Sequence, residues 1–433
     1  MFYQHRSFIV IFLPHSLTRI FKSETEVCQE KMFGIKKDGK LLLDNTGILQ
    51  RTPKKQTLPK TALFLTLLIM TSPVQAETVV NGRPSVVLEG KIARLIVDIG
   101  GGSIVDFQLS AQGINPLVFD NIVFEPKEKF FRPMAHFLCL DRWGAPSKAE
   151  KQNGMFFHGE ASRVEWKILK RPTLKGKLIK ASMSASLPLA GLEVKRLVQL
   201  SDTSATFTIS ETVINRNKLG RIYNMVQHPT IGPPFLDETT LVDSNARKGF
   251  MQPQSDPQPQ PTSLPTPEEP AVYWPHAVKK KEPVNLRQLT SDADPNVVSF
   301  IFEENLGWVT ASNAFQGLLI GYLWKTSEYP WLNIWRHVEK GKPFARGLEF
   351  GTTGLHAPFS ILVEKGKIFD RPLYVHLDTG QSVVRSYRAF LFEIPNDYQG
   401  VGRLTYTDGN LIIHERGRGA DRDLSMAIRD LFP

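Results

Sequence analysis

Three polar residues, far apart along the chain, carry side chains suited to moving protons near neutral pH. His158 opens the run His-Gly-Glu-Ala, His228 lies in Met-Val-Gln-His-Pro, and Glu349 lies in Gly-Leu-Glu-Phe-Gly. An imidazole titrates near neutrality and a carboxylate can act as a base, so the trio fits general acid–base catalysis. Each residue lies on or beside a strand-like run, and the fold has to bring the three together in one cleft.

Each of these residues also has an ordinary structural explanation. A His-Gly pair is often only a turn, and His228 precedes a proline, where an extended backbone is preferred. Glu349 alternates with Leu348 and Phe350, so on a strand it faces the other side, which can be the solvated one. The joint presence of all three residues favours a functional interpretation.

The elements that must position them are strands. Leu192–Leu200 has apolar residues at 192, 194, 198 and 200, and 206–215 alternates in the same way, with a hairpin turn at 202–204. Similar runs occur at 95–99, 104–109, 163–169, 297–302, 317–324, 331–336, 372–378 and 382–394. This pattern predicts an all-β protein, a large antiparallel sandwich with few short helices.

Two local patterns depart from strands. The spacing of the apolar residues over Ala420–Phe432 predicts a C-terminal helix. Gly100-Gly101-Gly102 predicts a tight turn between strands and not a phosphate loop, because no Gly-Lys-Ser/Thr follows.

Residues 253–270 contain 7 prolines among Gln, Ser, Thr and Glu, a composition that does not form a packed element. Similar strand patterns flank this segment, so we interpret it as an insertion within one domain that spans 77–433. Trp274, just after it, offers an aromatic surface on which a sugar ring could stack.

The N-terminal region has the pattern of an export signal. Basic residues precede the apolar run 62–70, and Val74-Gln75-Ala76 has small residues at the positions of a cleavage site. We therefore expect 54–76 to be a signal peptide, with no stable membrane span after its cleavage and a periplasmic or extracellular location. Residues 1–53 are expected to be an unstructured extension upstream of the true translation start.

Composition narrows the class of partner. Residues 1–76 carry 11 Lys/Arg against 5 Asp/Glu, so they account for +6 of the net charge of +10. The remainder is only mildly basic, which does not indicate nucleic-acid binding. Only Cys139 remains beyond the signal peptide, so no disulfide framework is expected. The other histidines show no paired ligand spacing, and we predict no metal and no other cofactor.

The run His158-Gly159-x-Ala161-x4-Trp166 resembles the first histidine motif of the aldose 1-epimerase (galactose mutarotase-like) superfamily. The likeness is greatest to its hexose-phosphate mutarotase branch and covers roughly residues 80–395. His228 and Glu349 stand in the order and at the separations of that family's second histidine and catalytic glutamate. The resemblance implies a β-supersandwich that interconverts the anomers of a sugar by opening its ring.

The resemblance also implies a role for each residue. Glu349 would remove the proton of the anomeric hydroxyl, His228 as imidazolium would protonate the ring oxygen, and His158 would orient the sugar. The family's sugar-binding arginine would be Arg132 or Arg142. Its sugar-binding aspartate would be Asp243, with Asp292 and Asp294 as alternatives.

The chain also departs from the family pattern. Ser162 stands where the motif usually has an arginine, and the neighbouring Arg163 would face the other side of a strand. The residues after His228 are Pro-Thr-Ile-Gly in place of the usual Thr/Ser-Tyr-Phe.

The sequence thus predicts an exported carbohydrate-binding protein, with aldose mutarotase as the favoured activity and a mono- or oligosaccharide as its substrate. A non-catalytic carbohydrate-binding protein on the same scaffold is one alternative, since fold alone does not fix function. A polysaccharide lyase or hydrolase is another, although a glycosidase normally needs two carboxylates and only Glu349 stands out.

Overall fold

The structure, a computed structural model, describes residues 78–119, 131–252 and 271–432. Strands dominate these residues, and every pair of neighbouring strands within them is antiparallel. The all-β class predicted from the sequence is confirmed. The predicted signal peptide at 54–76 and the proline-rich insertion at 253–270 lie outside the described residues.

The larger of two main sheets has twelve strands. Its order is β1 (Thr78–Val80), β2 (Arg83–Glu89), β3 (Ala93–Asp98), β4 (Ile104–Leu109), β5 (His136–Asp141), β10 (Arg221–Ile231), β20 (Lys342–Gly351), β19 (Trp331–Glu339), β16 (Val297–Ile301), β12 (Lys248–Met251) and β13 (Val272–Tyr273), with β23 (Val375–Leu377) paired to β10. Strands distant in sequence, such as β5, β10 and β20, are therefore neighbours.

The second main sheet has eight strands. Its order is β11 (Leu241–Ser244), β17 (Leu306–Asn313), β18 (Leu318–Lys325), β24 (Ser382–Glu393), β9 (Thr206–Asn215), β8 (Leu192–Ser201), β7 (Leu178–Leu187) and β6 (Lys167–Lys175). In β7, residues 179, 181, 183, 185 and 187 are buried and the residues between them are more exposed, as expected for a strand with one face on a core. The hairpin predicted at 202–204 joins β8 to β9 and is confirmed.

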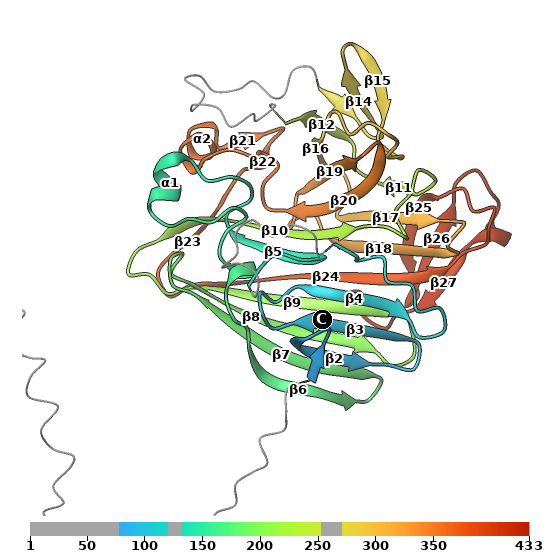
Figure 1. Ribbon diagram of the computed structural model, residues 1–433, viewed down its shortest axis with the longest axis horizontal. Coiled ribbons are helices and arrows are strands. Elements are labelled where there is room, and N and C mark those ends of the chain that lie inside the picture. The colour runs from blue at the N-terminus through green and yellow to red at the C-terminus, as the bar shows by residue number, and fades with distance from the viewer. Residues whose placement is uncertain (1–77, 120–130, 253–270, 433) are drawn as a thin grey trace, which may run out of the picture. The chain divides into compact units, whose positions relative to one another are not determined.

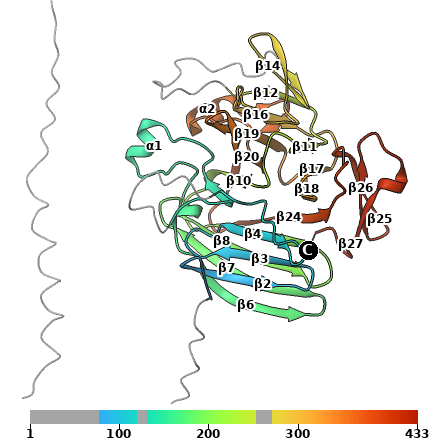
Figure 2. The same ribbon diagram turned by 45° about the vertical axis from the view of Figure 1, so that its right-hand side comes forward.

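Smaller elements surround these sheets. They are the hairpins β14–β15 (His276–Lys279, Glu282–Asn285) and β21–β22 (Lys367–Ile368, Arg371–Pro372), the sheet β25–β27 (Val401–Thr407, Asn410–Glu415, Leu424–Ala427), the helices α1 (Lys148–Gln152) and α2 (Phe359–Lys365), and the 3-10 turns η2 (Ala161–Arg163) and η3 (Ala420–Arg422). Both α-helices lie on the side of β5 and β10 that faces away from β7, β8 and β9 (Figures 1 and 2).

Aromatic contacts hold the two main sheets together. The Phe107 ring of β4 meets the Phe207 ring of β9 edge-on, with the centroids 4.7 Å apart. Phe350 of β20 stacks on Trp324 of β18 at 4.1 Å. Such pairs add about 0.5–1.5 kcal/mol each to the gain from burying their area. Because Phe350 points into this core, its neighbour Glu349 points to the opposite face of the large sheet.

Two predicted elements are wrong. The C-terminal helix is instead η3 followed by β27, whose Leu424–Ala427 pairs with β26. Pairing with an available strand edge decides the conformation there, since apolar spacing in a short run fits either structure. The strand predicted at 163–169 begins only at Lys167, after the η2 turn. The turn predicted at Gly100–Gly102 does join β3 to β4.

Candidate active site

A row of side chains crosses five strands on the face of the large sheet that points away from the eight-stranded sheet. The row comprises Phe137 of β5, His228 of β10, Glu349 of β20, Asn333 of β19 and Ser299 of β16. Gln227 pairs with Phe350 and Thr230 pairs with Gly347, and this register sets His228 opposite Glu349. The pairing of distant strands therefore brings two of the predicted residues together.

His228 and Glu349 are in direct contact. The His228 Nε2 lies 3.1 Å from the Glu349 Oε1, and the two side chains are only 5% and 2% exposed. The second oxygen, Oε2, accepts a hydrogen bond of 2.6 Å from the indole Nε1 of Trp143. His228 can therefore exchange a proton with Glu349, whereas the Trp143 indole can only donate a hydrogen bond to it.

The other ring nitrogen of His228 fixes the tautomer. Nδ1 lies 2.9 Å from the Thr230 hydroxyl, and this hydroxyl donates to the His228 carbonyl oxygen at 3.4 Å. The hydroxyl oxygen is then the acceptor for an Nδ1 proton, which leaves the lone pair on Nε2. In this arrangement Nε2 accepts a hydrogen bond from the protonated Glu349 carboxyl.

Aromatic rings surround this pair. The Phe137 ring stacks on the His228 ring with the centroids 4.2 Å apart, and Trp335 meets it at 5.9 Å. The His158 ring lies 5.2 Å from the His228 ring at a steep angle. All three residues singled out from the sequence therefore share one site.

The His158-Gly159 pair forms a left-handed turn, with φ of 64° at His158 and 78° at Gly159. A Cβ on Gly159 would collide with the carbonyl oxygen of Leu140 in β5, so only glycine allows this close approach. The His158 N–H donates to the Gly144 carbonyl, and the Gly144 N–H donates to the His158 Nδ1 at 3.2 Å. Because Nδ1 accepts, the ring proton lies on Nε2, where it can be donated to a ligand.

The rest of the His158 motif is structural. The Glu160 carboxylate accepts hydrogen bonds from the main-chain N–H groups of Leu189 and Ala190. The Trp166 indole donates to the Ala161 carbonyl at 2.9 Å and closes the loop. Because this loop is a 3-10 turn and not a strand, the strand-face argument for Arg163 does not apply, and its guanidinium lies over the Phe156 ring.

A polar framework holds loops over the site. Glu150 of α1 accepts hydrogen bonds from the Arg142 guanidinium and from the Phe359 N–H, both at 3.1 Å. Arg142 also donates to the Ala357 carbonyl at 2.9 Å. Arg142, the alternative sugar-binding arginine, is thus fully buried and engaged in tying the loop after β5 to the start of α2.

His356 belongs to this cover. Its ring lies 4.8 Å from the Trp143 ring and 6.3 Å from the His158 ring. Its main-chain N–H donates to the Gln252 side-chain oxygen at 3.0 Å, and the Gln252 amide donates to Ser299 in the row at 2.7 Å. The cover and the sheet surface are therefore connected by side-chain hydrogen bonds.

Burial disfavours charge on both members of the central pair. It raises the pKa of the Glu349 carboxyl to about 8, and the hydrogen bond from Trp143 offsets only part of this effect. It lowers the pKa of His228 to about 3 and that of His356 to about 4. The pKa of His158 is also well below its ordinary value, and burial is the main cause.

At neutral pH the pair therefore shares one proton, which lies on Glu349. The sequence-based hypothesis placed this proton on His228, as an imidazolium beside a carboxylate. The two arrangements differ by one proton transfer across the 3.1 Å contact, and both contain the same total number of protons.

The other predicted site residues do not join the trio. Asp243 lies in β11 of the eight-stranded sheet, where it binds the guanidinium groups of Arg287 at 2.6 Å and Arg416 at 2.9 Å and the main-chain N–H of Val401. Its four lone-pair directions are largely occupied by these donors. This carboxylate fastens the β25–β27 sheet to the core.

Arg132 and Trp274 are also elsewhere. Arg132 lies near the β3–β4 turn, with its main-chain oxygen close to Gly101. The Trp274 ring packs on Phe300 of β16. Phe300 follows Ser299, which belongs to the row, so Phe300 points to the other face of the sheet. Trp274 is therefore on the opposite face of the large sheet. The alternative Asp292 pairs with Lys279 at the exposed β14–β15 hairpin.

Sequence reasoning missed Trp143, Asn333 and His356. Trp143 and His356 lie in loops without a periodic pattern, and only the fold shows that Trp143 donates to Glu349 and that His356 packs on Trp143. Asn333 carried a usable signal, because the predicted strand 331–336 places it on the same face as Trp331 and Trp335.

Within the described ranges, no group of three or more His, Cys, Asp or Glu side chains is arranged to hold a metal ion. No helix in the same ranges is long and apolar enough to cross a membrane.

Known structures share this fold. A galactose mutarotase-like protein from Clostridium acetobutylicum aligns with a TM-score of 0.55 and 14% identity over 74% of this chain and 98% of its own. A galactose mutarotase related enzyme from Lactobacillus acidophilus aligns with a TM-score of 0.50 and 11% identity over 72% and 98%. At such identities the likeness shows the fold, which is the galactose mutarotase-like supersandwich predicted from the sequence.

A comparison with curated proteins gives no match. Residues 138–367 match the family model described as Domain of unknown function (DUF4432), which is 230 of the 433 residues and includes His158, His228 and Glu349. The chain belongs to the DUF4432 family.

Proposed function

We propose that this protein is an aldose mutarotase in which Glu349 and His228 move the two protons of sugar ring opening. The observation that carries the proposal is the 3.1 Å contact between these two side chains, which are buried together on one sheet face. Mutarotation needs one group to take the proton of the anomeric hydroxyl and another to protonate the ring oxygen. A carboxyl and an imidazole that share one proton supply both groups.

The sugar itself selects the reactive arrangement. Its hydroxyls hydrogen-bond the Glu349 carboxylate and so replace part of the solvation that burial removes. The proton then moves to His228, which protonates the ring oxygen while Glu349 takes the proton of the anomeric hydroxyl. The C–O bond of the ring breaks, the aldehyde carbon rotates, and closure from the other face returns both protons to their donors. His158 donates its Nε2 proton to the sugar and orients it.

Access to Glu349 requires the cover to move, because the carboxyl is only 2% exposed. Trp143 occupies one carboxylate oxygen, and a sugar hydroxyl can take that place only when the indole withdraws. The loop after β5 carries Trp143 and ends at α1, so we propose that this loop opens when the sugar binds. The partners of Glu349 are an indole and an imidazole and not a second carboxylate, which disfavours glycoside hydrolysis.

NMR exchange spectroscopy on candidate aldoses tests this activity. We expect the protein to accelerate exchange between α and β signals, and Glu349→Gln and His228→Asn to lose this while still binding the sugar. Glu339→Gln, at the exposed end of β19, is the matched control and should retain the full rate. Binding without exchange in the unmodified protein would indicate a carbohydrate-binding module, and release of shortened or unsaturated oligosaccharides would indicate a hydrolase or lyase.

We also propose that the protein is exported, on the basis of the signal-peptide pattern at 54–76. N-terminal sequencing of the secreted or periplasmic protein should find Glu77 as the first residue. A mature protein that retains residues 1–53 would contradict this proposal.

A further inference from the structure

A pocket separate from the trio opens where loops from both main sheets meet. It is lined by the segment after β16, the β18–β19 connection, Thr352, the β22–β23 segment and Arg385 of β24. Its volume of ≈ 310 Å³ is near the lower end of the ~300–1,000 Å³ typical of small-molecule sites, which suits a ligand of about one sugar ring. None of His158, His228 or Glu349 lines it.

Arg385 is the most deeply buried charge in the wall, at 8% exposed. Its Nε donates to the main-chain oxygen of Glu328 at 3.1 Å and its Nη1 to the Tyr223 hydroxyl at 3.3 Å. Both acceptors are neutral, and across 78–119, 131–252 and 271–432 no carboxylate forms an ion pair with Arg385. Its Nη2 donates to no residue in these ranges. The buried Glu211, opposite Arg385 on β9, has its carboxylate bound by Arg196 and Gln227. Burying a guanidinium without an ion pair of its own is costly, so Arg385 favours an anionic partner.

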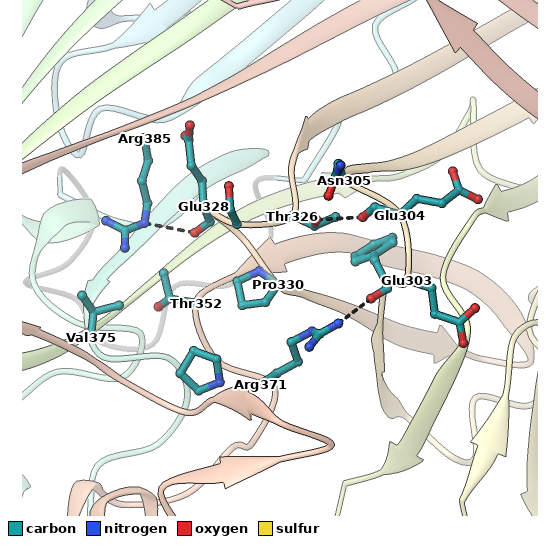
Figure 3. A pocket seen from close by; sticks show the side chains of 13 residues that line it. Glu303, Glu304, Asn305, Thr326, Glu328, Pro330, Thr352, Arg371, Val375 and Arg385 are labelled. Carbon is teal, nitrogen blue, oxygen red and sulfur yellow. Dashed lines mark hydrogen bonds between the residues drawn. The ribbon is translucent and has the colours of Figure 1, made fainter.

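The carboxylates around the pocket do not supply that anion. The Glu328 carboxylate accepts from the Ser386 N–H at 2.6 Å, and Glu304 accepts from the Asn245 amide at 3.1 Å. Figure 3 shows the carboxylates of Glu303, Glu304 and Glu328 directed away from the space around Pro330 and Thr352. The remaining charged groups of the lining are the guanidinium groups of Arg371 and Arg385.

The rest of the lining supplies donors and an apolar wall. Arg371 is half-buried and uses its Nη2 to donate to the Phe302 carbonyl at 3.0 Å, which leaves its other N–H groups for a ligand. The Thr352 oxygen accepts from the Met225 N–H, so its own proton can be donated. Pro330 and Val375 provide the apolar surface against which a carbon ring can lie.

We propose that this pocket binds a small hydroxylated organic acid of the sugar-acid type. Its carboxylate pairs with Arg385, its hydroxyls accept from Arg371 and Thr352, and its ring lies on Pro330 and Val375. A charge-assisted pair supplies most of the discrimination against a neutral sugar of the same shape. This inference does not depend on anomer exchange at Glu349.

Calorimetric titration with methyl β-D-glucuronide and methyl β-D-glucoside tests the proposal. These probes differ only at the carboxylate, and their fixed anomeric carbon prevents turnover at Glu349. The glucuronide should bind at least about 10-fold more tightly than the glucoside, and Arg385→Gln should remove at least about 10-fold of its affinity, as expected for a hydrogen bond to a charged group. Arg371→Gln should weaken binding less.

The controls keep a folding defect distinct from a lost site. Val375→Phe fills the pocket without changing charge and should abolish binding of both probes, and circular dichroism checks that Arg385→Gln is folded. Arg418→Gln, an exposed arginine, should bind the glucuronide like the unmodified protein. The proposal is overturned if the two glycosides bind equally, if neither binds at millimolar concentration, if inorganic phosphate binds more tightly than the glucuronide, or if Val375→Phe binds normally.

Discussion

Glu349 and Asp243 are both buried carboxylates, at 2% and 0% exposed, but their surroundings differ in kind. Asp243 has two guanidinium groups and a main-chain N–H as partners. Glu349 has an indole and an imidazole, both neutral when buried. The first carboxylate is matched by fixed positive charge and is suited to holding the β25–β27 sheet in place. The second is not, so its pKa rises to about 8 and it can gain and lose a proton.

The comparison shows why a carboxylate cannot be assigned a role from its residue type alone. The family resemblance implied a role for each, Glu349 as the catalytic base and Asp243, with Asp292 and Asp294 as alternatives, as a sugar ligand. Their cationic or neutral partners come from strands and loops more than 40 residues away, such as Arg287 and Arg416 for Asp243. The charge of those partners decides whether a buried carboxylate stabilises the fold or exchanges a proton.

The largest expected effect is the loss of activity in Glu349→Gln. Glutamine has the shape of the protonated carboxyl, so it can still accept from Trp143 and donate to the His228 Nε2, but it cannot exchange a proton. We expect the anomer-exchange rate to fall by about 10²–10⁴-fold, the usual value of one general acid–base group. NMR exchange rates at saturating sugar measure this loss, and a variant that keeps more than half of the rate would remove Glu349 from the reaction.

The same substitution should stabilise the fold at alkaline pH. The folded pKa of Glu349 is about 8 and the ordinary value is 4.5, so between these values the unfolded chain loses its proton while the folded chain keeps it. Stability therefore falls as pH rises from 4.5 to 8, and glutamine does not have this dependence. We expect Glu349→Gln to be more stable at pH 8 by on the order of 1–4 kcal/mol, and nearly equal at pH 4, in urea denaturation.

Asp243→Asn should have the opposite effect on stability. Removing the charge leaves Arg287 and Arg416 without their anion, and breaking such a pair costs about 3 kcal/mol. Asp292→Asn is the matched control, because its pair with Lys279 is at the surface and is worth less than about 1 kcal/mol. Urea denaturation of the two variants measures the difference. If Asp243→Asn is as stable as the unmodified protein, Asp243 does not stabilise the fold. The two buried carboxylates then do not divide into a structural one and a catalytic one.

The pH profile tests the shared proton. If the reactive pair must hold one proton, kcat/KM should be level near neutrality and fall about tenfold per unit above pH 8, where Glu349 loses it. The acid limb belongs to the addition of a second proton near pH 3. Stopped-flow polarimetry over pH 4–10 measures the level region and the alkaline limb. A rate that rises through pH 8 would show instead that an unpaired Glu349 carboxylate is the active base.

The strands and the meeting of the trio could be predicted from the sequence because they depend on local alternation and on motif order. His158-Gly159 predicts its own turn, since the left-handed backbone and the approach to Leu140 require a glycine. The helix at 420–432 failed because a short apolar run has no conformation of its own until β26 offers an edge. Trp143 could not be predicted, because its position over Glu349 depends on the loop that Arg142 and Glu150 hold.

The smallest expected effect sharpens the comparison most directly. Trp143→Phe keeps an aromatic ring over the site but removes the N–H that donates to the Glu349 Oε2, and this donation lowers the pKa of the carboxyl. Without it the pKa of Glu349 should rise further, and the alkaline limb of kcat/KM should move to higher pH by about one unit, the value of one hydrogen bond. Trp335→Phe is the control, because Trp335 contacts the His228 ring at 5.9 Å and makes no hydrogen bond to Glu349, so its limb should stay in place. Equal profiles for both variants would mean that burial alone sets the proton affinity of Glu349, and that its contrast with Asp243 lies only in the absence of arginine.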